Sequence, residues 1–359
     1  MNTSSVVLRD RWLRVNFGAG RPAHADFHYL WLRHNCALDL HPTTRERLVD
    51  ASEIDERIAP TSARIDGDSL VVSWNDAVRR ESRYPLAWLR AHAYAAEREE
   101  PPRPVTALDA LTLDARSLDR VALFRAALEG VERHGVVRVV HFRPSGDPRP
   151  EDTEAIIDAL SDAGLSVVGT HFGRIEDLRV DNSTNQNTDQ LGYTDAAVHL
   201  HTDQPFLEAP PTFQALHCIA PAPRGGESFL VDARALAEIL RAEDADAYEL
   251  LRTVPVTFHR KQKSFEKILS APILGEDGPA GFRVRYSYFT LAPYRVPFAQ
   301  MERWYRAHRR FAELVRDERH HVRFLLGAGD FVLYDNHRML HARTSFEGHR
   351  WLRGVYFDR

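Results

Sequence analysis

The chain has 359 residues, of which 43% are hydrophobic and 27% are charged, and its formal net charge is −4. This balance is typical of a globular protein large enough for two domains, and it excludes the strongly basic surface of most nucleic-acid-binding proteins. No apolar run approaches the ~20 residues of a membrane span, and the first residues lack the apolar stretch of a secretory signal. Only Cys36 and Cys218 occur, too few for a disulfide framework, so we expect a cytoplasmic protein.

The first 95 residues predict a small antiparallel β-rich domain. Its strand candidates include HYLWLRHN and DSLVVSW, with a polar turn at Asp66-Gly67-Asp68. Residues 96–107 form the predicted linker, because AEREEPPRPV is first highly charged and then rich in proline. Residues 108–359 are predicted to form the second, larger domain.

The larger domain begins with predicted helices and continues mainly with predicted strands. One helix is expected in SLDRVALFRAALEGVERHG, with Ser117 as N-cap and Gly135 at its end, and a second in PEDTEAIIDALSDAG. Beyond residue 195, strand-like segments are interrupted by two helical ones, RALAEILRAEDADAYELLRTV and FAQMERWYRAHRRFAELVRD. This pattern predicts a mainly β fold, a sandwich or barrel, with flanking helices.

The stretch HLHTDQPFLEAPP, residues 199–211, carries His199, His201 and Asp203 at alternating positions, so a strand would direct all three to one face. An H-x-D pair alone is more often an ordinary hydrogen-bonded pair than a metal site. Far downstream, however, DFVLYDNHRMLHARTSF places His341 just after a strand. Two histidines and one carboxylate form the facial triad of non-haem iron(II) oxygenases. We therefore predict that His201, Asp203 and His341 bind iron.

Between these two motifs lie HC at residues 217–218 and GGES at residues 225–228. Together the four motifs resemble those of the iron(II)/2-oxoglutarate dioxygenases of the γ-butyrobetaine and trimethyllysine hydroxylase group, and more distantly taurine dioxygenase. The resemblance covers nearly the whole chain, since WLRHNC and AWLRAHAY resemble the small N-terminal domain of that group. It implies a double-stranded β-helix (jelly-roll) catalytic domain. It also implies that Arg350 pairs with the distal carboxylate of 2-oxoglutarate, aided by Ser228 where relatives usually have threonine.

The resemblance implies hydroxylation of an unactivated C–H bond in a small amino-acid-like or betaine-like zwitterion, with release of succinate and carbon dioxide. Asp203 favours this outcome, because related halogenases have a small residue in its place. Two alternatives stay open: a tailoring dioxygenase that hydroxylates, desaturates or cyclises a larger amine-bearing metabolite or aminophosphonate, and a non-catalytic binding protein on the same fold. We expect a small-molecule substrate and no nucleic-acid or membrane partner, and a homodimer is one option.

Five residues are predicted to contact the substrate. Tyr193, Tyr356 and Phe172 fall where relatives hold a trimethylammonium group against aromatic faces. Glu176 stands where a tryptophan would be expected, and Gln190 completes the set. A carboxylate gains most from a cation that carries N–H donors, so Glu176 predicts a primary, secondary or guanidinium-type nitrogen. The competing interpretation makes these aromatic residues ordinary core residues.

A basic run in HRKQKSFEK, residues 259–267, suggests that the other end of the substrate is acidic. A solvated hairpin explains this run equally well. In the small domain, the resemblance implies a structural zinc held by cysteines and a histidine. Cys36 and His41 alone cannot complete a tetrahedral site, so we predict that the zinc is absent.

Overall fold

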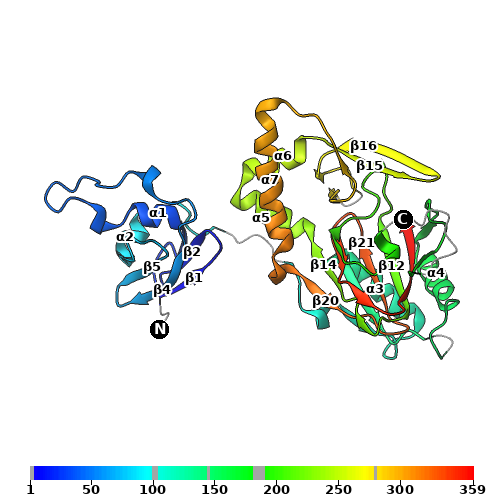
Figure 1. Ribbon diagram of the computed structural model, residues 1–359. Coiled ribbons are helices and arrows are strands. Elements are labelled where there is room, and N and C mark those ends of the chain that lie inside the picture. Colours follow the sequence, from blue (N-terminus) through cyan, green and yellow to red (C-terminus); the bar gives the residue numbers. More distant parts are fainter. Residues whose placement is uncertain (1–3, 99–103, 144–145, 181–190, 279–280) are drawn as a thin grey trace. The chain divides into compact units, whose positions relative to one another are not determined.

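The computed structural model describes residues 4–98, 104–143, 146–180, 191–278 and 281–359. The chain divides into two compact units, residues 1–100 and 101–359 (Figure 1). Residues 99–103 of the predicted linker lie outside the described residues. Within the described part of the chain, no helix is both long enough and apolar enough to cross a membrane.

The smaller unit contains two three-stranded antiparallel sheets. In sheet order their strands are β1 (Ser5–Leu8), β2 (Trp12–Asn16) and β3 (His24–His28), then β4 (Pro60–Asp66), β5 (Ser69–Trp74) and β6 (Glu81–Pro85). Two short helices, α1 (Tyr29–His34) and α2 (Leu86–Ala91), follow β3 and β6. Leu13 and Phe27 from the first sheet and Leu70 from the second belong to one apolar core, whose burial stabilises the unit.

One predicted strand of the smaller unit is wrong. HYLWLRHN, residues 28–35, forms α1 instead of a strand. Tyr29 and Leu32 are both buried, and their spacing of three fits a helix rather than the two-residue period of a strand. The strand predicted in DSLVVSW is present as β5, and Gly67 has a φ of 62° in the predicted turn before it.

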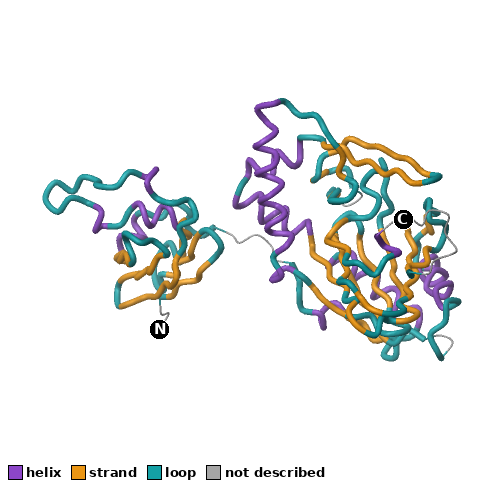
Figure 2. The backbone as a smooth tube through the Cα atoms, in the orientation of Figure 1, coloured by secondary structure: helices purple, strands orange, loops and turns teal. Residues whose placement is uncertain are grey.

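The larger unit is rich in strands and carries helices, as predicted (Figure 2). Its seven-stranded sheet has the order β10-β24-β12-β21-β8-β7, with β9 also pairing with β24, and a second sheet has the order β11-β22-β14-β20. The strands of the first sheet are β7 (Thr112–Asp114), β8 (Val136–Val140), β9 (Ser166–Val168), β10 (Glu176–Leu178), β12 (Phe213–Ala220), β21 (Phe331–Asp335) and β24 (Trp351–Asp358). Those of the second are β11 (Val198–His201), β14 (Ser228–Asp232), β20 (Val322–Phe324) and β22 (Met339–Arg343).

Smaller sheets lie beside the two main ones. They pair β13 (Arg224–Gly225) with β23 (Phe346–Glu347), β15 (Val256–Gln262) with both β16 (Phe265–Ala271) and β19 (Leu291–Ala292), and β17 (Leu274–Gly275) with β18 (Arg283–Val284). The β15–β16 hairpin contains the basic run of residues 259–267 and forms a long two-stranded arm in Figure 1.

The helices of the larger unit form two groups. They are α3 (Arg120–His134), α4 (Asp152–Asp162), α5 (Ala233–Glu243), α6 (Ala245–Thr253) and α7 (Phe298–Arg316). Phe124 of α3 packs with Phe331 of the seven-stranded sheet in one apolar core. Helices α5, α6 and α7 gather at one side of the unit, where Trp304 and Phe311 belong to a second core (Figure 2).

Two helix boundaries differ from the prediction. The N-cap of α3 is Asp119, whose carboxylate accepts a hydrogen bond from the Ala122 N–H at 2.8 Å, whereas the Ser117 N–H donates to Asp114 in the preceding turn. Gly135 ends α3 with a φ of 81°, as predicted. The helical segment after β14 is two helices, because Asp244 leaves the helical conformation, with φ −150° and ψ 79°, and caps α6 by accepting from the Ala247 N–H.

Candidate active site

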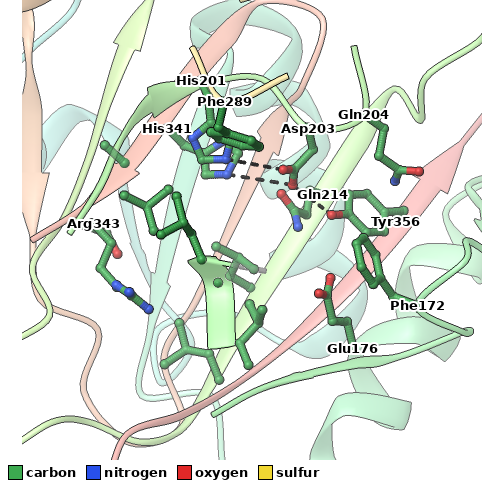
Figure 3. Close-up of a pocket in the computed structure, with 18 of the residues that line it drawn as sticks. Phe172, Glu176, His201, Asp203, Gln204, Gln214, Phe289, His341, Arg343 and Tyr356 are labelled. Atoms are coloured by element: carbon green, nitrogen blue, oxygen red, sulfur yellow. Dashed lines mark hydrogen bonds and ion pairs between the residues drawn. The ribbon is translucent and has the colours of Figure 1, made fainter. Parts of the chain in front are cut away.

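Strand pairing brings the three predicted iron ligands together. Strands β11 and β22 pair in antiparallel fashion with His201 opposite His341, and Asp203 follows two residues after β11. The His201 Nε2 lies 3.4 Å from Asp203 Oδ1, and the His341 Nε2 lies 3.7 Å from Asp203 Oδ2 (Figure 3). One ligand atom from each residue lies within 4.8 Å of the others. Two imidazole nitrogens and one carboxylate oxygen therefore converge on one point.

The expectation that His199 shares this face is wrong. The pairing of β11 with β22 shifts register between Val198 and His201, so His199 is exposed while His201 is buried. The His199 backbone oxygen instead accepts a hydrogen bond from His201 Nδ1 at 2.8 Å. Because a carbonyl oxygen only accepts, the proton of His201 lies on Nδ1, and the lone pair of Nε2 is left for a metal.

The electrostatics of the triad suit a divalent cation. Burial, together with the charge of His201, lowers the pKa of His341 to about 3, so its imidazole is neutral at physiological pH. Burial also opposes the ionisation of Asp203, but both histidines and the Tyr356 hydroxyl outweigh this effect and keep its pKa below its usual range. The buried His341 Nδ1 has no hydrogen-bond partner in the part of the chain that the structure describes. A carboxylate beside two imidazoles fits iron(II) in a facial triad.

A cavity of about 290 Å³ opens beside the triad. Arg350 and Ser228 line it, and both are buried. No carboxylate among the described residues forms an ion pair with Arg350, whose guanidinium lies 5.5 Å from the Phe346 ring. Burial, followed by the charge of Arg343, lowers the pKa of Arg350 to about 10, so it stays charged at neutral pH. This charged group is available to an anionic ligand.

Arg343 also lines the cavity but is already engaged. Its Nη2 donates to the backbone oxygens of Thr194, at 2.8 Å, and Ala196. Figure 3 shows Arg343 on one side of the cavity and Glu176 and Phe172 on the other. The two sides of the cavity therefore differ in charge.

The side opposite Arg343 holds most of the predicted substrate residues. Phe172, Glu176 and Tyr356 line the cavity, and the Tyr356 hydroxyl donates to Asp203 Oδ2 at 2.8 Å. Tyr193, in the short 3₁₀ helix Leu191–Tyr193, does not line it, and its hydroxyl donates to Glu176 Oε1 at 3.0 Å. Tyr193 thus reaches the cavity through Glu176. Gln190 lies outside the described residues.

The hairpin with the basic run contributes a single basic residue to the cavity among the described residues. Arg260 lines it, whereas Lys261 pairs with Glu266 at 3.2 Å on the exposed part of the β15–β16 hairpin. Lys263 and Lys267 are exposed. The solvated-hairpin interpretation therefore fits the lysines, and the acidic-substrate interpretation depends on Arg260.

Two polar residues beside the triad were not predicted from the sequence. Gln204 lines the cavity directly after Asp203 and is 4% exposed, and neither of its side-chain amide atoms has a hydrogen-bond partner among the described residues. Its φ of 55° is uncommon for a residue other than glycine. Asn336, in the turn before His341, hydrogen-bonds the backbone of Asp203. For Gln204, its position next to Asp203 was the available signal.

In the smaller unit, Cys36 and His41 do not form part of a metal-binding group. Cys36 is buried, and His41 Nδ1 accepts from the Thr44 N–H at 3.1 Å. Across the described residues, the triad is the group that meets the geometry of a metal site. The absence of zinc stays a prediction.

Comparisons with known proteins place the chain in a family. The model of the family described as "Taurine catabolism dioxygenase TauD, TfdA family" matches residues 100–356. Gamma-butyrobetaine dioxygenase from Pseudomonas sp. (strain AK-1) is 33% identical over 93% of this chain and 88% of its own length. Mitochondrial trimethyllysine dioxygenase from Gallus gallus is 27% identical over 93% of this chain and 81% of its own length.

Solved structures agree at the level of the fold. A putative alpha-ketoglutarate-dependent taurine dioxygenase from Burkholderia xenovorans has a TM-score of 0.51 and 18% identity, covering 71% of this chain and 90% of that one. The predicted resemblance to the γ-butyrobetaine and trimethyllysine group is confirmed by the two relatives. With a family match over residues 100–356 and a relative 33% identical across almost the whole sequence, this chain belongs to the TauD, TfdA family of dioxygenases.

Proposed function

We propose that this dioxygenase uses iron(II), held by His201, Asp203 and His341, and 2-oxoglutarate to hydroxylate an unactivated C–H bond of a small zwitterionic substrate. The observation that carries the proposal is the convergence of two imidazoles and one carboxylate beside a cavity that is lined by the buried guanidinium of Arg350, with which no carboxylate of the described residues pairs. The relatives named for γ-butyrobetaine and trimethyllysine support an amino-acid-like or betaine-like substrate. The substrate class and the double-stranded β-helix description of the larger unit are part of this proposal.

The chain's own residues prepare the metal ligands. The backbone oxygen of His199 accepts a hydrogen bond from His201 Nδ1, and this bond fixes the imidazole with Nε2 free to bind a metal. Tyr356 donates to one oxygen of Asp203, which leaves the other oxygen for the metal. When bound, iron(II) with 2-oxoglutarate and oxygen supplies the oxidising power, and the co-substrates end as succinate, carbon dioxide and the transferred oxygen atom.

Arg350 is proposed to bind the distal carboxylate of 2-oxoglutarate. Its planar guanidinium matches a carboxylate with two parallel hydrogen bonds, and burial strengthens that interaction. Ser228 lines the same cavity and offers a hydroxyl donor. The ligand would bring its own negative charge to a cation that no protein carboxylate in the described chain neutralises.

Glu176 is proposed to select the cationic end of the substrate. It places a carboxylate in the cavity wall near Phe172 and Tyr356, with Tyr193 donating to one of its oxygens. A substrate nitrogen with N–H donors gains a charge-assisted hydrogen bond there, which a quaternary ammonium group cannot form. Arg260, which also lines the cavity, is proposed to attract an acidic group of the substrate. Together these residues favour a zwitterion.

The cavity volume bears on the predicted alternatives. About 290 Å³ is at the small end of ligand pockets, which favours a small amino-acid-like substrate over a larger metabolite. Membership of a dioxygenase family favours an enzyme over a non-catalytic binding protein. The cytoplasmic location and the homodimer stay predictions.

A succinate-release screen over betaines, amino acids and aminophosphonates tests the function. We expect at least one zwitterionic amine to stimulate succinate formation well above the substrate-free rate. Addition of iron(II) and 2-oxoglutarate without oxygen should also give a weak visible charge-transfer band. A wild-type protein that gives neither the band nor succinate would refute the proposed function.

A further inference from the structure

We propose that Asn336 is a positioning residue that holds the main chain at Asp203 and so directs its carboxylate toward the two histidines. This inference rests on the proposed iron binding by the triad. Asn336 is 1% exposed and lies in the turn between β21 and β22. It does not belong to the triad and does not line the cavity. Its role therefore has to come from the groups that it contacts.

The Asn336 side chain uses both ends of its amide on the segment after β11. The Asp203 N–H donates to Asn336 Oδ1 at 2.8 Å, and Asn336 Nδ2 donates to the Asp203 backbone oxygen at 3.1 Å. Nδ2 also donates to the Pro211 backbone oxygen at 3.0 Å. A single side chain thus satisfies both backbone groups of the residue that supplies the carboxylate.

Asp203 needs such a restraint because it lies beyond the strand. The last residue of β11 that pairs with β22 is His201, so no strand ladder fixes Asp203. The next residue, Gln204, turns the chain with a positive φ of 55°. Tyr356 holds the Asp203 carboxylate from β24, but it contacts the side chain rather than the backbone. The amide of Asn336 replaces the missing ladder at this point.

The position of Asn336 also links all three proposed metal ligands to the β21–β22 hairpin. His341 is on β22, His201 pairs directly with His341, and Asn336 begins the turn that leads into β22. The Asn336 N–H donates to the Thr212 oxygen at 2.8 Å, so the turn is itself held against the segment before β12. All three metal ligands are therefore positioned relative to the β21–β22 hairpin, two by strand geometry and one by Asn336.

Replacing Asn336 tests this role without touching a ligand. Asn336→Ala removes all three side-chain hydrogen bonds and leaves buried backbone groups unsatisfied, so Asp203 should lose its fixed orientation. We expect the dissociation constant for iron(II), measured by anaerobic titration with 2-oxoglutarate through the charge-transfer band, to rise about tenfold, as for other residues that orient metal ligands. The ratio of succinate released to hydroxylated product formed should also increase, because a metal whose carboxylate ligand has lost its fixed orientation is positioned less well toward the substrate.

Thr212→Val provides a matched control in the segment before β12, which contacts the turn that holds Asn336. It removes the hydrogen bond from Thr212 Oγ1 to Asp358 at 2.8 Å and does not alter any contact to Asp203. Both variants should lower the unfolding temperature of the metal-free protein, but only Asn336→Ala should weaken iron binding. Wild-type affinity and an unchanged band in a folded Asn336→Ala protein would overturn the inference.

A second variant keeps the test decisive if Asn336→Ala does not fold. Asn336→Asp retains an acceptor for the Asp203 N–H but cannot donate to the Asp203 and Pro211 oxygens, so its iron affinity should also fall. Wild-type affinity in a folded Asn336→Asp protein would overturn the inference too. The wild-type titration separates the two levels of proposal. Absence of the band in the wild type contradicts the iron site itself, whereas a normal band in the wild type and both variants contradicts only the role of Asn336.

Discussion

Two enclosed carboxylates, one in each unit, have opposite surroundings. Asp39 of the smaller unit is 6% exposed and pairs with two guanidinium groups, those of Arg33 and Arg79, the latter at 2.6 Å. Asp203 of the larger unit faces His201 and His341, whose nitrogens lie 3.4 and 3.7 Å from its oxygens. The chain neutralises the first carboxylate with its own cations, and it leaves the second beside two histidines. Such an uncompensated carboxylate is where an external cation is stabilised.

The same contrast holds for guanidinium groups. Arg33 is 3% exposed and bridges Asp39 and Asp76, with its Nε 2.7 Å from Asp76 Oδ2. Arg350 is 7% exposed, and no carboxylate among the described residues pairs with it. The paired charges of Arg33 and Asp39 therefore connect loops of the smaller unit, whereas Arg350, which has no carboxylate partner among the described residues, marks a proposed ligand site of the larger unit.

The largest expected effect comes from removing a ligand from the triad of His201, Asp203 and His341. His341→Ala removes one of the three proposed iron ligands, so succinate formation should be abolished with every substrate. The protein should still fold, because β22 keeps its pairing with β14 through backbone hydrogen bonds. Succinate release and a circular dichroism spectrum test both points. Undiminished turnover in His341→Ala would contradict the assignment of iron to the triad.

Breaking the ion-pair network around Asp39 in the smaller unit should lower the stability of the protein and leave its activity unchanged. Arg33→Ala leaves Asp39 without one of its two cations and Asp76 without its partner, which should cost about 3 kcal/mol of unfolding free energy. Urea unfolding followed by tryptophan fluorescence measures it, since Trp12, Trp31, Trp74 and Trp88 lie in the smaller unit.

Arg57→Ala is the matched control for this network. Arg57 pairs with Asp55 at 3.2 Å, but both side chains are largely exposed and screened by solvent, so its loss should leave the unfolding free energy nearly unchanged. Equal effects of Arg33→Ala and Arg57→Ala would show that the buried network does not stabilise the unit.

Arg350→Lys tests the unpaired guanidinium. Lysine keeps the positive charge but loses the two-pronged geometry, so the KM for 2-oxoglutarate should rise about tenfold or more. Arg353→Lys serves as control, because Arg353 bonds Asp177 at 3.2 Å and does not line the cavity. An unchanged KM in Arg350→Lys would transfer the role to another arginine, with Arg343 the next candidate.

Glu176 is the second carboxylate of the cavity, and its substitution should alter substrate preference. Wild-type enzyme should favour the unmethylated counterparts of γ-butyrobetaine and trimethyllysine by about tenfold, the value of one charge-assisted hydrogen bond. Glu176→Trp should shift the preference toward the trimethylated compounds, and Glu176→Gln should weaken binding of both. A strong wild-type preference for the trimethylated compounds would contradict the role of Glu176.

The sequence predicted those parts of the site that carry distinctive chemistry. His201, Asp203 and His341 stood out because the H-x-D pair is joined by a second histidine just after a downstream strand, and the cap at Gly135 is a local property of a helix end. Asn336 could not be recognised, because its contact with Asp203 spans 133 residues and asparagine is ordinary in a turn. The register shift that exposes His199 also depends on the partner strand, which no local pattern encodes.

The smallest expected effect is the response of the smaller unit to chelators. The resemblance implies a zinc in this unit, but the loop after α1 is tied by Asp39 to Arg79, which lies between β5 and β6, and Arg33 adds Asp76 from the same segment. Ion pairs thus connect the segments without a metal, and Cys36 and His41 supply too few ligands to hold one. Protein purified without added metal should contain less than stoichiometric zinc by elemental analysis. A chelator should leave the unfolding midpoint of His341→Ala, which lacks a complete iron triad, unchanged. One tightly held zinc per chain in this variant, released only on unfolding, would show that the smaller unit does hold a metal.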